Sequence, residues 1–105
     1  MNKLFLIAGP CIVENGETPF FIGKEVNSIC DELGIDFIFK ASYKKANRTR
    51  IDSFKGIGFQ ESLAILQGVG RELGVRTITD VHESHEPELV ANYVDILQIP
   101  AFLCR

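Results

Sequence analysis

The sequence contains few cysteines and no long apolar run. Its 105 residues include three cysteines, an odd and sparse set that gives no disulfide framework and fits a reducing compartment. The first apolar run, residues 4–8, is preceded by a single lysine and is too short for a signal peptide or a membrane span. We therefore expect a cytoplasmic protein that does not cross a membrane.

An excess of basic residues is also missing. The chain has 11 lysines and arginines against 14 aspartates and glutamates, which gives a net charge of −3. Binding a nucleic-acid backbone requires a broad basic face, so this balance argues against a general nucleic-acid surface. The apolar content of 46% is ordinary for a soluble globular protein, and the length allows one small domain.

The basic residues that are present cluster in one segment. Residues 40–50 contain five cations and no acid, directly behind the apolar run 37–39. Ser42, Asn47 and Thr49 lie among the cations, and neutral donors between fixed charges are what oriented recognition of phosphate or carboxylate requires. A solvated basic loop is the alternative interpretation. The segment predicts a site for small anions.

Short apolar runs alternate with segments of helical periodicity. We predict strands at 4–8, 36–40, 75–80 and 96–99, and helices at 19–33, at 59–73 and over a short stretch after residue 84. Thr18 and Ser84 have the residue type of N-caps, and the unbroken first run is typical of a strand buried on both faces. Gly68 and Gly70 within the second helix indicate weak points or close packing. Strands alternating with helices predict parallel βαβ units.

A polar residue stands at the end of each predicted strand. These residues are Cys11, Lys40, Asp80 and Gln98. Side chains gathered at the carboxyl ends of successive strands are typical of a (β/α)8 TIM barrel, although a doubly wound α/β sheet would fit the same alternation. Because the barrel needs about 250 residues, residues 1–105 would form the amino-terminal half of a single barrel domain, with about its first four strands.

Six motifs in register resemble one enzyme family, the 3-deoxy-D-manno-octulosonate 8-phosphate (Kdo8P) synthases. They are Ile7–Cys11, Lys40–Ser42, Lys45–Arg48, Ser53–Gly56, Thr79–Glu83 and Gln98–Arg105. Several motifs in the right order are more specific than any one of them. The resemblance implies a homotetrameric TIM-barrel transferase of lipopolysaccharide biosynthesis, which condenses phosphoenolpyruvate and D-arabinose 5-phosphate with water to give Kdo8P and phosphate. Residues 1–105 alone are expected to be inactive.

The resemblance also assigns roles to individual residues. Those expected to bind phosphoenolpyruvate are Lys40, Ser42, Lys45, Gln98, Ala101 and Phe102. Those expected to bind arabinose 5-phosphate are Asn47, Arg48 and Thr49, with Arg105 reaching the sugar phosphate in a neighbouring subunit. Lys45 and Asp80 are expected to be catalytic, Asp80 by binding a sugar hydroxyl or ordering the lysines. In the alternative interpretation Arg105 is merely exposed and Asp80 pairs with Lys40 or Lys45.

Cys11 resembles the cysteine of the metal-dependent branch of this family. There the thiolate joins a histidine, a glutamate and an aspartate from the second half of the barrel. Thiolate and imidazole are soft to borderline donors, so the resemblance implies a divalent transition metal such as Zn²⁺, Fe²⁺, Mn²⁺ or Cd²⁺. The metal would position or polarise the attacking water or the sugar aldehyde. Without the family, a lone cysteine at a strand end is more often a small buried residue.

We expect the remaining cysteines and histidines to have structural roles. His82, Glu83 and His85 do not have the spacing of a zinc-binding helix, so we expect packing and hydrogen bonding from them. Cys30 and Cys104 are expected to be core residues.

Two other functions stay open at this point. The related 3-deoxy-arabino-heptulosonate 7-phosphate synthases share the barrel and the Gly-Pro-Cys motif, but they typically carry Lys-Pro-Arg-Thr where this chain has residues 45–48, Lys-Ala-Asn-Arg. A catalytically inactive half-barrel or phosphate-binding module would fit the short length.

Overall fold

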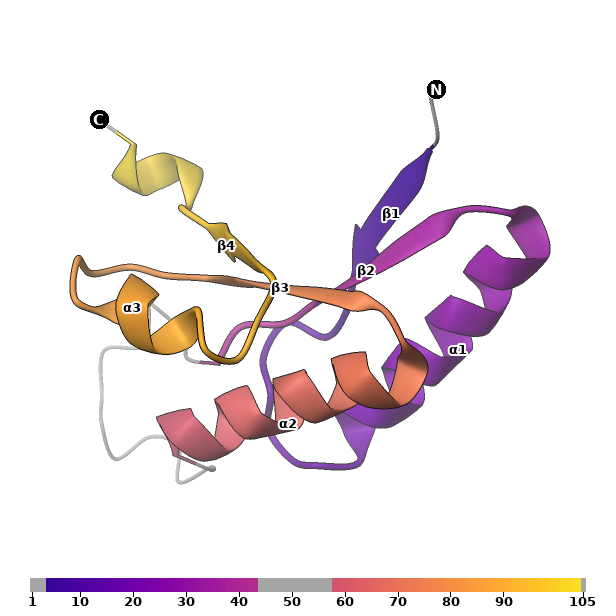
Figure 1. The fold of residues 1–105 in the computed structure, drawn as a ribbon, viewed down its shortest axis with the longest axis horizontal. Helices are drawn as coiled ribbons and strands as arrows, with labels where there is room; N and C mark the ends of the chain where they lie inside the picture. The colour runs from indigo at the N-terminus through magenta and orange to yellow at the C-terminus, as the bar shows by residue number, and fades with distance from the viewer. Residues whose placement is uncertain (1–3, 44–57, 105) are drawn as a thin grey trace.

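The computed structural model describes residues 4–43 and 58–104. Within them strands and helices alternate (Figure 1). They are β1 (Phe5–Ala8), α1 (Thr18–Leu33), β2 (Asp36–Lys40), α2 (Phe59–Leu73), β3 (Arg76–Asp80), α3 (Glu86–Val90), β4 (Ile96–Gln98) and the 3-10 helix η2 (Ala101–Leu103). The predicted alternation is confirmed, and the strand ends differ from the prediction by at most one residue.

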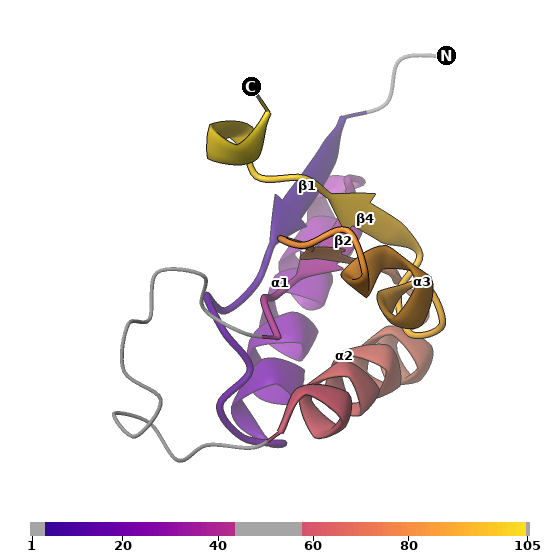
Figure 2. The same cartoon turned by 90° about the vertical axis from the view of Figure 1, so that its left-hand side faces the viewer.

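The four strands form one parallel sheet in the order β1-β2-β3-β4. Helices α1 and α2 pack against each other on one face of this sheet, and Leu63 of α2 meets Val90 of α3 on the same side (Figures 1 and 2). A doubly wound sheet reverses its strand order and carries helices on both faces. Sequential order with helices on one face is the arrangement of consecutive units of a (β/α)8 barrel, consistent with its first part.

The core lies between the sheet and the helices. Side chains alternate along a strand, so Phe37 and Phe39 of β2 face the helices, where they join Cys30, Leu66 and Val69. Burying a large apolar side chain contributes about 1.5–3 kcal/mol, which makes this layer the main source of stability. The burial of Cys30 confirms its predicted core role. Lys40 lies on the opposite face of β2, because it is one residue beyond Phe39.

Two predictions of burial are wrong, one for strand β1 and one for Cys104. Strand β1 was expected to be buried on both faces, but Phe5 is 53% and Ile7 42% exposed. The reason is that β1 pairs only with β2 and no described element covers its other side. Cys104 is also exposed, since it follows η2 at the surface and not in the helix-facing layer.

Both predicted N-caps are wrong as well. Helix α1 begins at Thr18 itself, and the Oδ1 atom of Asn15 accepts hydrogen bonds from the N–H groups of Glu17 and Thr18. Ser84 makes no cap for α3. There the side chain of Glu86 reaches back to the preceding loop. Asn15 thus satisfies N–H groups that a helix start leaves free, whereas Glu86 accepts from N–H groups of the loop before α3.

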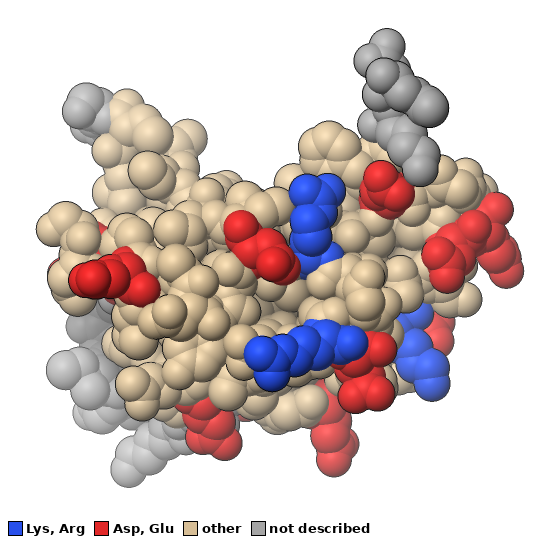
Figure 3. Space-filling model, viewed as in Figure 1, with Lys and Arg blue, Asp and Glu red and all other residues tan. Residues whose placement is uncertain are grey.

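Figure 3 shows the charges on one face of the molecule, where basic side chains lie between acidic ones. In the part of the chain that the structure describes, no helix combines the length and apolar character needed to cross a membrane.

Substituting the two glycines within α2 is expected to have opposite effects. A Cβ atom on Gly70 would lie 2.7 Å from Cγ2 of Thr77 and 3.1 Å from the carbonyl oxygen of Val75, so Gly70→Ala should destabilise the protein by about 1–3 kcal/mol. A Cβ on Gly68 would meet no atom within 4 Å, so Gly68→Ala should stabilise it by up to about 1 kcal/mol. Urea unfolding of both variants measures the difference; equal effects would contradict the close packing of α2 on β3.

Candidate functional site

The carboxyl ends of β2, β3 and β4 present polar side chains on one face of the sheet. The strand register places Lys40 beside Ile78 and Asp80 beside Gln98. Because residues i and i+2 of a strand share a face, Asp80 lies on the same face as Ile78 and therefore on that of Lys40. This is the face away from the helices, which in a (β/α)8 barrel is the interior.

Asp80 is held by two side chains. Its Oδ1 atom accepts a hydrogen bond of 2.6 Å from the hydroxyl of Ser42, and its Oδ2 atom lies 3.2 Å from Nε2 of His82. The side chains of His82 and Asp80 are only 10% and 15% exposed. Both carboxylate oxygens are therefore engaged, and a hydroxyl, a carboxylate and an imidazole are fixed at the carboxyl ends of β2 and β3.

Neither partner of Asp80 was predicted. A sugar hydroxyl or a lysine was expected there, and His82 was expected to serve packing and hydrogen bonding. His82 does have a polar partner, since its Nε2 atom lies within ion-pair distance of Asp80. His85, by contrast, is exposed and lies 3.6 Å from the carboxylate of Glu83, so it is not a packing residue. The spacing of His82 two residues after Asp80 is the signal that could have predicted a shared face.

Cys11 lies beside Ser42. The N–H of Ser42 donates to the carbonyl of Cys11 at 3.2 Å, and the N–H of Val13 donates back to Ser42 at 3.0 Å. These bonds extend the pairing of β1 and β2 past the ends of the strands. Cys11 is exposed and so is accessible to a ligand, which argues against the small buried residue of the alternative interpretation.

The segment after β4 closes the other side of the cluster. The N–H of Val81 donates to the carbonyl of Gln98 at 3.0 Å, and the ring of Phe102 lies 6.4 Å from the ring of His82, centroid to centroid. Ala101 precedes Phe102 in η2, and both are exposed. We call this group the carboxyl-end site. It consists of Cys11, Lys40, Ser42, Asp80, His82, Gln98, Ala101 and Phe102.

Two buried polar atoms of this site have no hydrogen-bond partner among the described residues. They are Nδ1 of His82 and Oε1 of Gln98. Leaving a buried polar atom unpaired costs about 1–3 kcal/mol, so native proteins rarely do so without a reason. Both atoms are enclosed, so the side chains of His82 and Gln98 would have to turn before a polar ligand at the carboxyl-end site could pair with them.

Tyr43 lies buried beneath the loop that carries His82. Its ring packs edge-on against Phe59, with ring centroids 5.8 Å apart. Burial raises the pKa of the Tyr43 phenol above its ordinary value, and the carboxylate of Glu86 raises it further. Tyr43 therefore stays a neutral phenol at physiological pH and serves as a packing residue.

The remaining predicted site residues lie outside the described residues. They are Lys45, Asn47, Arg48, Thr49 and Arg105. Their roles stay predictions. Residues 4–43 and 58–104 contain no group of three or more histidines, cysteines, aspartates or glutamates that could hold a metal ion. Cys11 can contribute one thiolate, which suits a transition metal but needs further donors.

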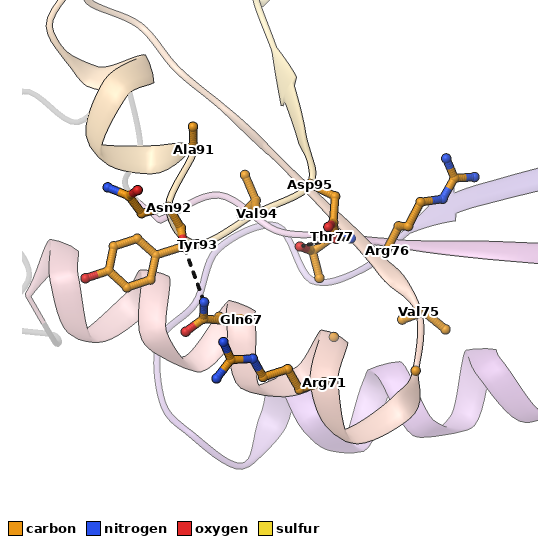
Figure 4. A pocket seen from close by; sticks show the side chains of 12 residues that line it. Gln67, Arg71, Val75, Arg76, Thr77, Ala91, Asn92, Tyr93, Val94 and Asp95 are labelled. Carbon is orange, nitrogen blue, oxygen red and sulfur yellow. Dashed lines mark hydrogen bonds between the residues drawn. The ribbon is translucent and has the colours of Figure 1, made fainter.

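A hollow lies at the opposite end of the sheet, at the amino ends of β3 and β4. It has a volume of about 540 Å³ and lies between α2, the start of β3 and the segment before β4 (Figure 4). Two pairs of its polar groups are hydrogen-bonded to each other. The Oδ2 atom of Asp95 accepts from the N–H of Thr77 at 2.9 Å, and Nε2 of Gln67 donates to the carbonyl of Asn92 at 3.3 Å. In barrels the amino-terminal face serves stability, so we favour the carboxyl-end site as the functional one.

Comparisons with known proteins show which family the chain belongs to. Residues 1–105 match the sequence model of the DAHP synthetase I family. The chain is 50% identical over 102 residues to a 2-dehydro-3-deoxyphosphooctonate aldolase of Synechococcus sp., covering 97% of this chain and 36% of that protein. The protein of that name from Campylobacter jejuni subsp. doylei is 48% identical over 105 residues, covering 100% and 39%. That of Acidithiobacillus ferrooxidans is 50% identical over 104 residues, covering 99% and 37%. The chain thus spans less than two fifths of the length of these relatives.

Proposed function

The chain belongs to the DAHP synthetase I family, and we propose that the complete protein is a Kdo8P synthase. It would condense phosphoenolpyruvate, D-arabinose 5-phosphate and water to Kdo8P and phosphate, in lipopolysaccharide biosynthesis. The proposal is supported by the relatives named 2-dehydro-3-deoxyphosphooctonate aldolase, which are 48–50% identical to this chain over nearly its whole length. The structural observation behind it is the Ser42–Asp80–His82 cluster at the carboxyl ends of β2 and β3.

The charges of the site suit these substrates. Phosphoenolpyruvate carries a phosphate and a carboxylate, and arabinose 5-phosphate carries a second phosphate, so three anionic groups must be held. Lys40 stands at the carboxyl end of β2, and the predicted ligands Lys45 and Arg48 follow it in the sequence. Arginine can grip a phosphate with two parallel hydrogen bonds, whereas lysine acts as a point charge. We therefore assign Arg48 to the sugar phosphate and Lys40 and Lys45 to phosphoenolpyruvate.

The described side chains have separate tasks in this proposal. Asp80 fixes the Ser42 hydroxyl and the His82 ring, so that both are oriented before the substrates arrive. Such preorganisation lowers the cost of ordering groups during the reaction. Gln98, Ala101 and Phe102 line the phosphoenolpyruvate side, and Oε1 of Gln98 is a buried acceptor without a partner among the described residues. We further propose a cytoplasmic homotetramer, with Arg105 reaching into a neighbouring subunit.

We propose Cys11 as one ligand of a divalent transition metal. Its side chain is exposed, next to the chain segment that pairs with Ser42, and the other donors would come from outside the described residues. A bound metal would supply Lewis acidity for the water or the aldehyde.

Removing the Cys11 thiolate is expected to release the metal and abolish turnover, because the ligand set is then incomplete. The measurement is the metal content of the purified complete protein by mass spectrometry, together with activity before and after chelation. Cys104→Ala is the matched control, since this cysteine is also exposed and should leave both quantities unchanged. Full activity of the unmodified protein after complete chelation would refute the metal assignment, and it would leave the substrate assignment intact.

The choice of sugar tests the proposed function. Purified protein is incubated with phosphoenolpyruvate and either arabinose 5-phosphate or erythrose 4-phosphate, and the product is identified by mass spectrometry alongside phosphate release. We expect Kdo8P from the five-carbon sugar and little product from the four-carbon sugar. The reverse preference would favour the heptulosonate synthase alternative, and no product with either sugar would favour an inactive protein.

A further inference from the structure

Among the described residues, Glu86 is the most deeply buried carboxylate, and it is not a member of the carboxyl-end site. It is the first residue of α3 and is only 6% exposed. A buried carboxylate is costly unless hydrogen bonds compensate for its lost hydration. A nearby residue of the same type, Glu88, lies in the same turn and is exposed, so position in the helix alone does not account for the burial.

The hydrogen bonds of Glu86 go to the loop between β3 and α3. Its Oε1 atom accepts from the N–H of His82 at 2.6 Å and from the N–H of Glu83 at 3.1 Å. In return, the N–H of Glu86 donates to the carbonyl of Glu83 at 3.0 Å. These reciprocal bonds resemble a capping box, in which an acidic side chain reaches back three residues to a free N–H. They fix the backbone at the position from which the His82 side chain projects.

His82 in turn contacts Asp80. Fixing the His82 backbone limits where its ring can lie, and the observed ring places Nε2 3.2 Å from Oδ2 of Asp80. Asp80 also holds the Ser42 hydroxyl, which belongs to the neighbouring strand. A continuous set of hydrogen bonds and contacts therefore runs from Glu86 to the side chains that face the substrates.

Glu86 also lies close to Tyr43. Its carboxylate is near enough to Tyr43 to raise the pKa of the phenol, and Tyr43 packs with Val81 and Val90. The same carboxylate thus acts on both the loop that carries His82 and Tyr43.

We propose that Glu86 is a positioning residue, whose carboxylate holds His82 against Asp80 and so sets the geometry of the carboxyl-end site. This inference rests on the proposed function only for its effect on catalysis. Its structural part concerns the loop alone and can be measured without any substrate.

The test compares three variants of the complete protein. Glu86→Gln keeps an Oε1 atom that can accept the same two N–H bonds, Glu86→Ala removes it, and Glu88→Ala is the control at an exposed position of the same turn. Amide hydrogen exchange at residues 82 and 83 and the NMR shifts of the His82 ring are recorded well below the unfolding temperature. Turnover of phosphoenolpyruvate and arabinose 5-phosphate is measured in parallel.

We expect Glu86→Ala to speed exchange at the His82 amide by about ten- to hundredfold and to shift its ring signals, because a buried hydrogen bond is lost. The value of kcat/KM should fall at least about tenfold, since 1.36 kcal/mol corresponds to a factor of ten. Glu86→Gln should stay within about threefold of the unmodified protein, and Glu88→Ala should change nothing. Unchanged exchange and ring shifts in Glu86→Ala would overturn the inference.

Two further outcomes separate this inference from the proposed function. If the loop loosens in Glu86→Ala but kcat/KM is unaffected in an active enzyme, Glu86 is a structural cap and the positioning role is refuted. If the unmodified protein makes no Kdo8P at all, the proposed function fails, and the exchange and ring-shift results still decide whether Glu86 holds His82 against Asp80.

Discussion

Replacing Asp80 by alanine is expected to lower kcat/KM by a factor of about 30 to 1,000. The substitution removes the acceptor of the 2.6 Å bond from Ser42 and the partner of His82 at once. Each hydrogen bond to a charged group contributes about 1.5–3 kcal/mol, and the estimate allows for partial replacement by water. Asp80→Asn should give an intermediate loss, because the amide keeps one oxygen for the Ser42 hydroxyl but lacks the charge.

Asp95→Ala is the control for Asp80. Asp95 also hydrogen-bonds β3, but at its amino end, where Oδ2 accepts from the N–H of Thr77. Its loss should lower the free energy of unfolding by about 1–3 kcal/mol and leave the KM for phosphoenolpyruvate unchanged. Steady-state kinetics and urea unfolding of both variants make the comparison. An Asp80→Ala enzyme within threefold of normal activity would show that the cluster has no catalytic importance.

Gly9→Ala is expected to be the most destabilising single methyl addition near the site. A Cβ at this position would lie 1.7 Å from the carbonyl oxygen of Lys40. Its nearest neighbours are all backbone atoms of Lys40, which cannot move aside as a flexible side chain can. Overpacking usually costs about 1–3 kcal/mol, and a clash with backbone should reach at least the upper end of that range. Since Lys40 also belongs to the carboxyl-end site, activity should fall with stability.

The control for Gly9 is Gly16→Ala. A Cβ on Gly16 would find its nearest neighbour, Cδ1 of Ile65, at 3.9 Å, which is an ordinary contact. This variant should remain within about 0.5 kcal/mol of the unmodified protein. Urea unfolding of the complete protein distinguishes the two substitutions. If Gly9→Ala were equally well tolerated, the close approach of the segment after β1 to the end of β2 would be wrong.

Local sequence patterns were sufficient to predict the elements of this fold. The apolar run 37–39 is short and rich in aromatic and β-branched residues, and the helices carry regular apolar spacing and end at Gly34 and Gly74. Both glycines have a positive φ, near 70°, which other residues rarely adopt. The (β/α)8 interpretation followed from the polar residues at the strand ends, and the strand order β1-β2-β3-β4 agrees with it.

The site was predictable as a location but not as a network. Ser42 and Asp80 are 38 residues apart, and only the parallel register of β2 and β3 brings their side chains together. The pattern of a single chain does not give that register. The predictions of the N-caps were wrong for a related reason. The side chains of Asn15 and Glu86 accept hydrogen bonds from N–H groups two or more residues away, whereas the prediction placed the capping residue at the helix start itself. The exposure of β1 depends on what covers it, which lies beyond local sequence.

A crystal structure of the complete protein with phosphoenolpyruvate bound tests the central claim most directly. The account predicts the ligand at the carboxyl-end site, with its anionic groups near Lys40 and Ser42 and a hydrogen bond to Gln98. Electron density for the ligand in the hollow at the amino ends of the strands, between Arg71 and Asn92, would contradict the account.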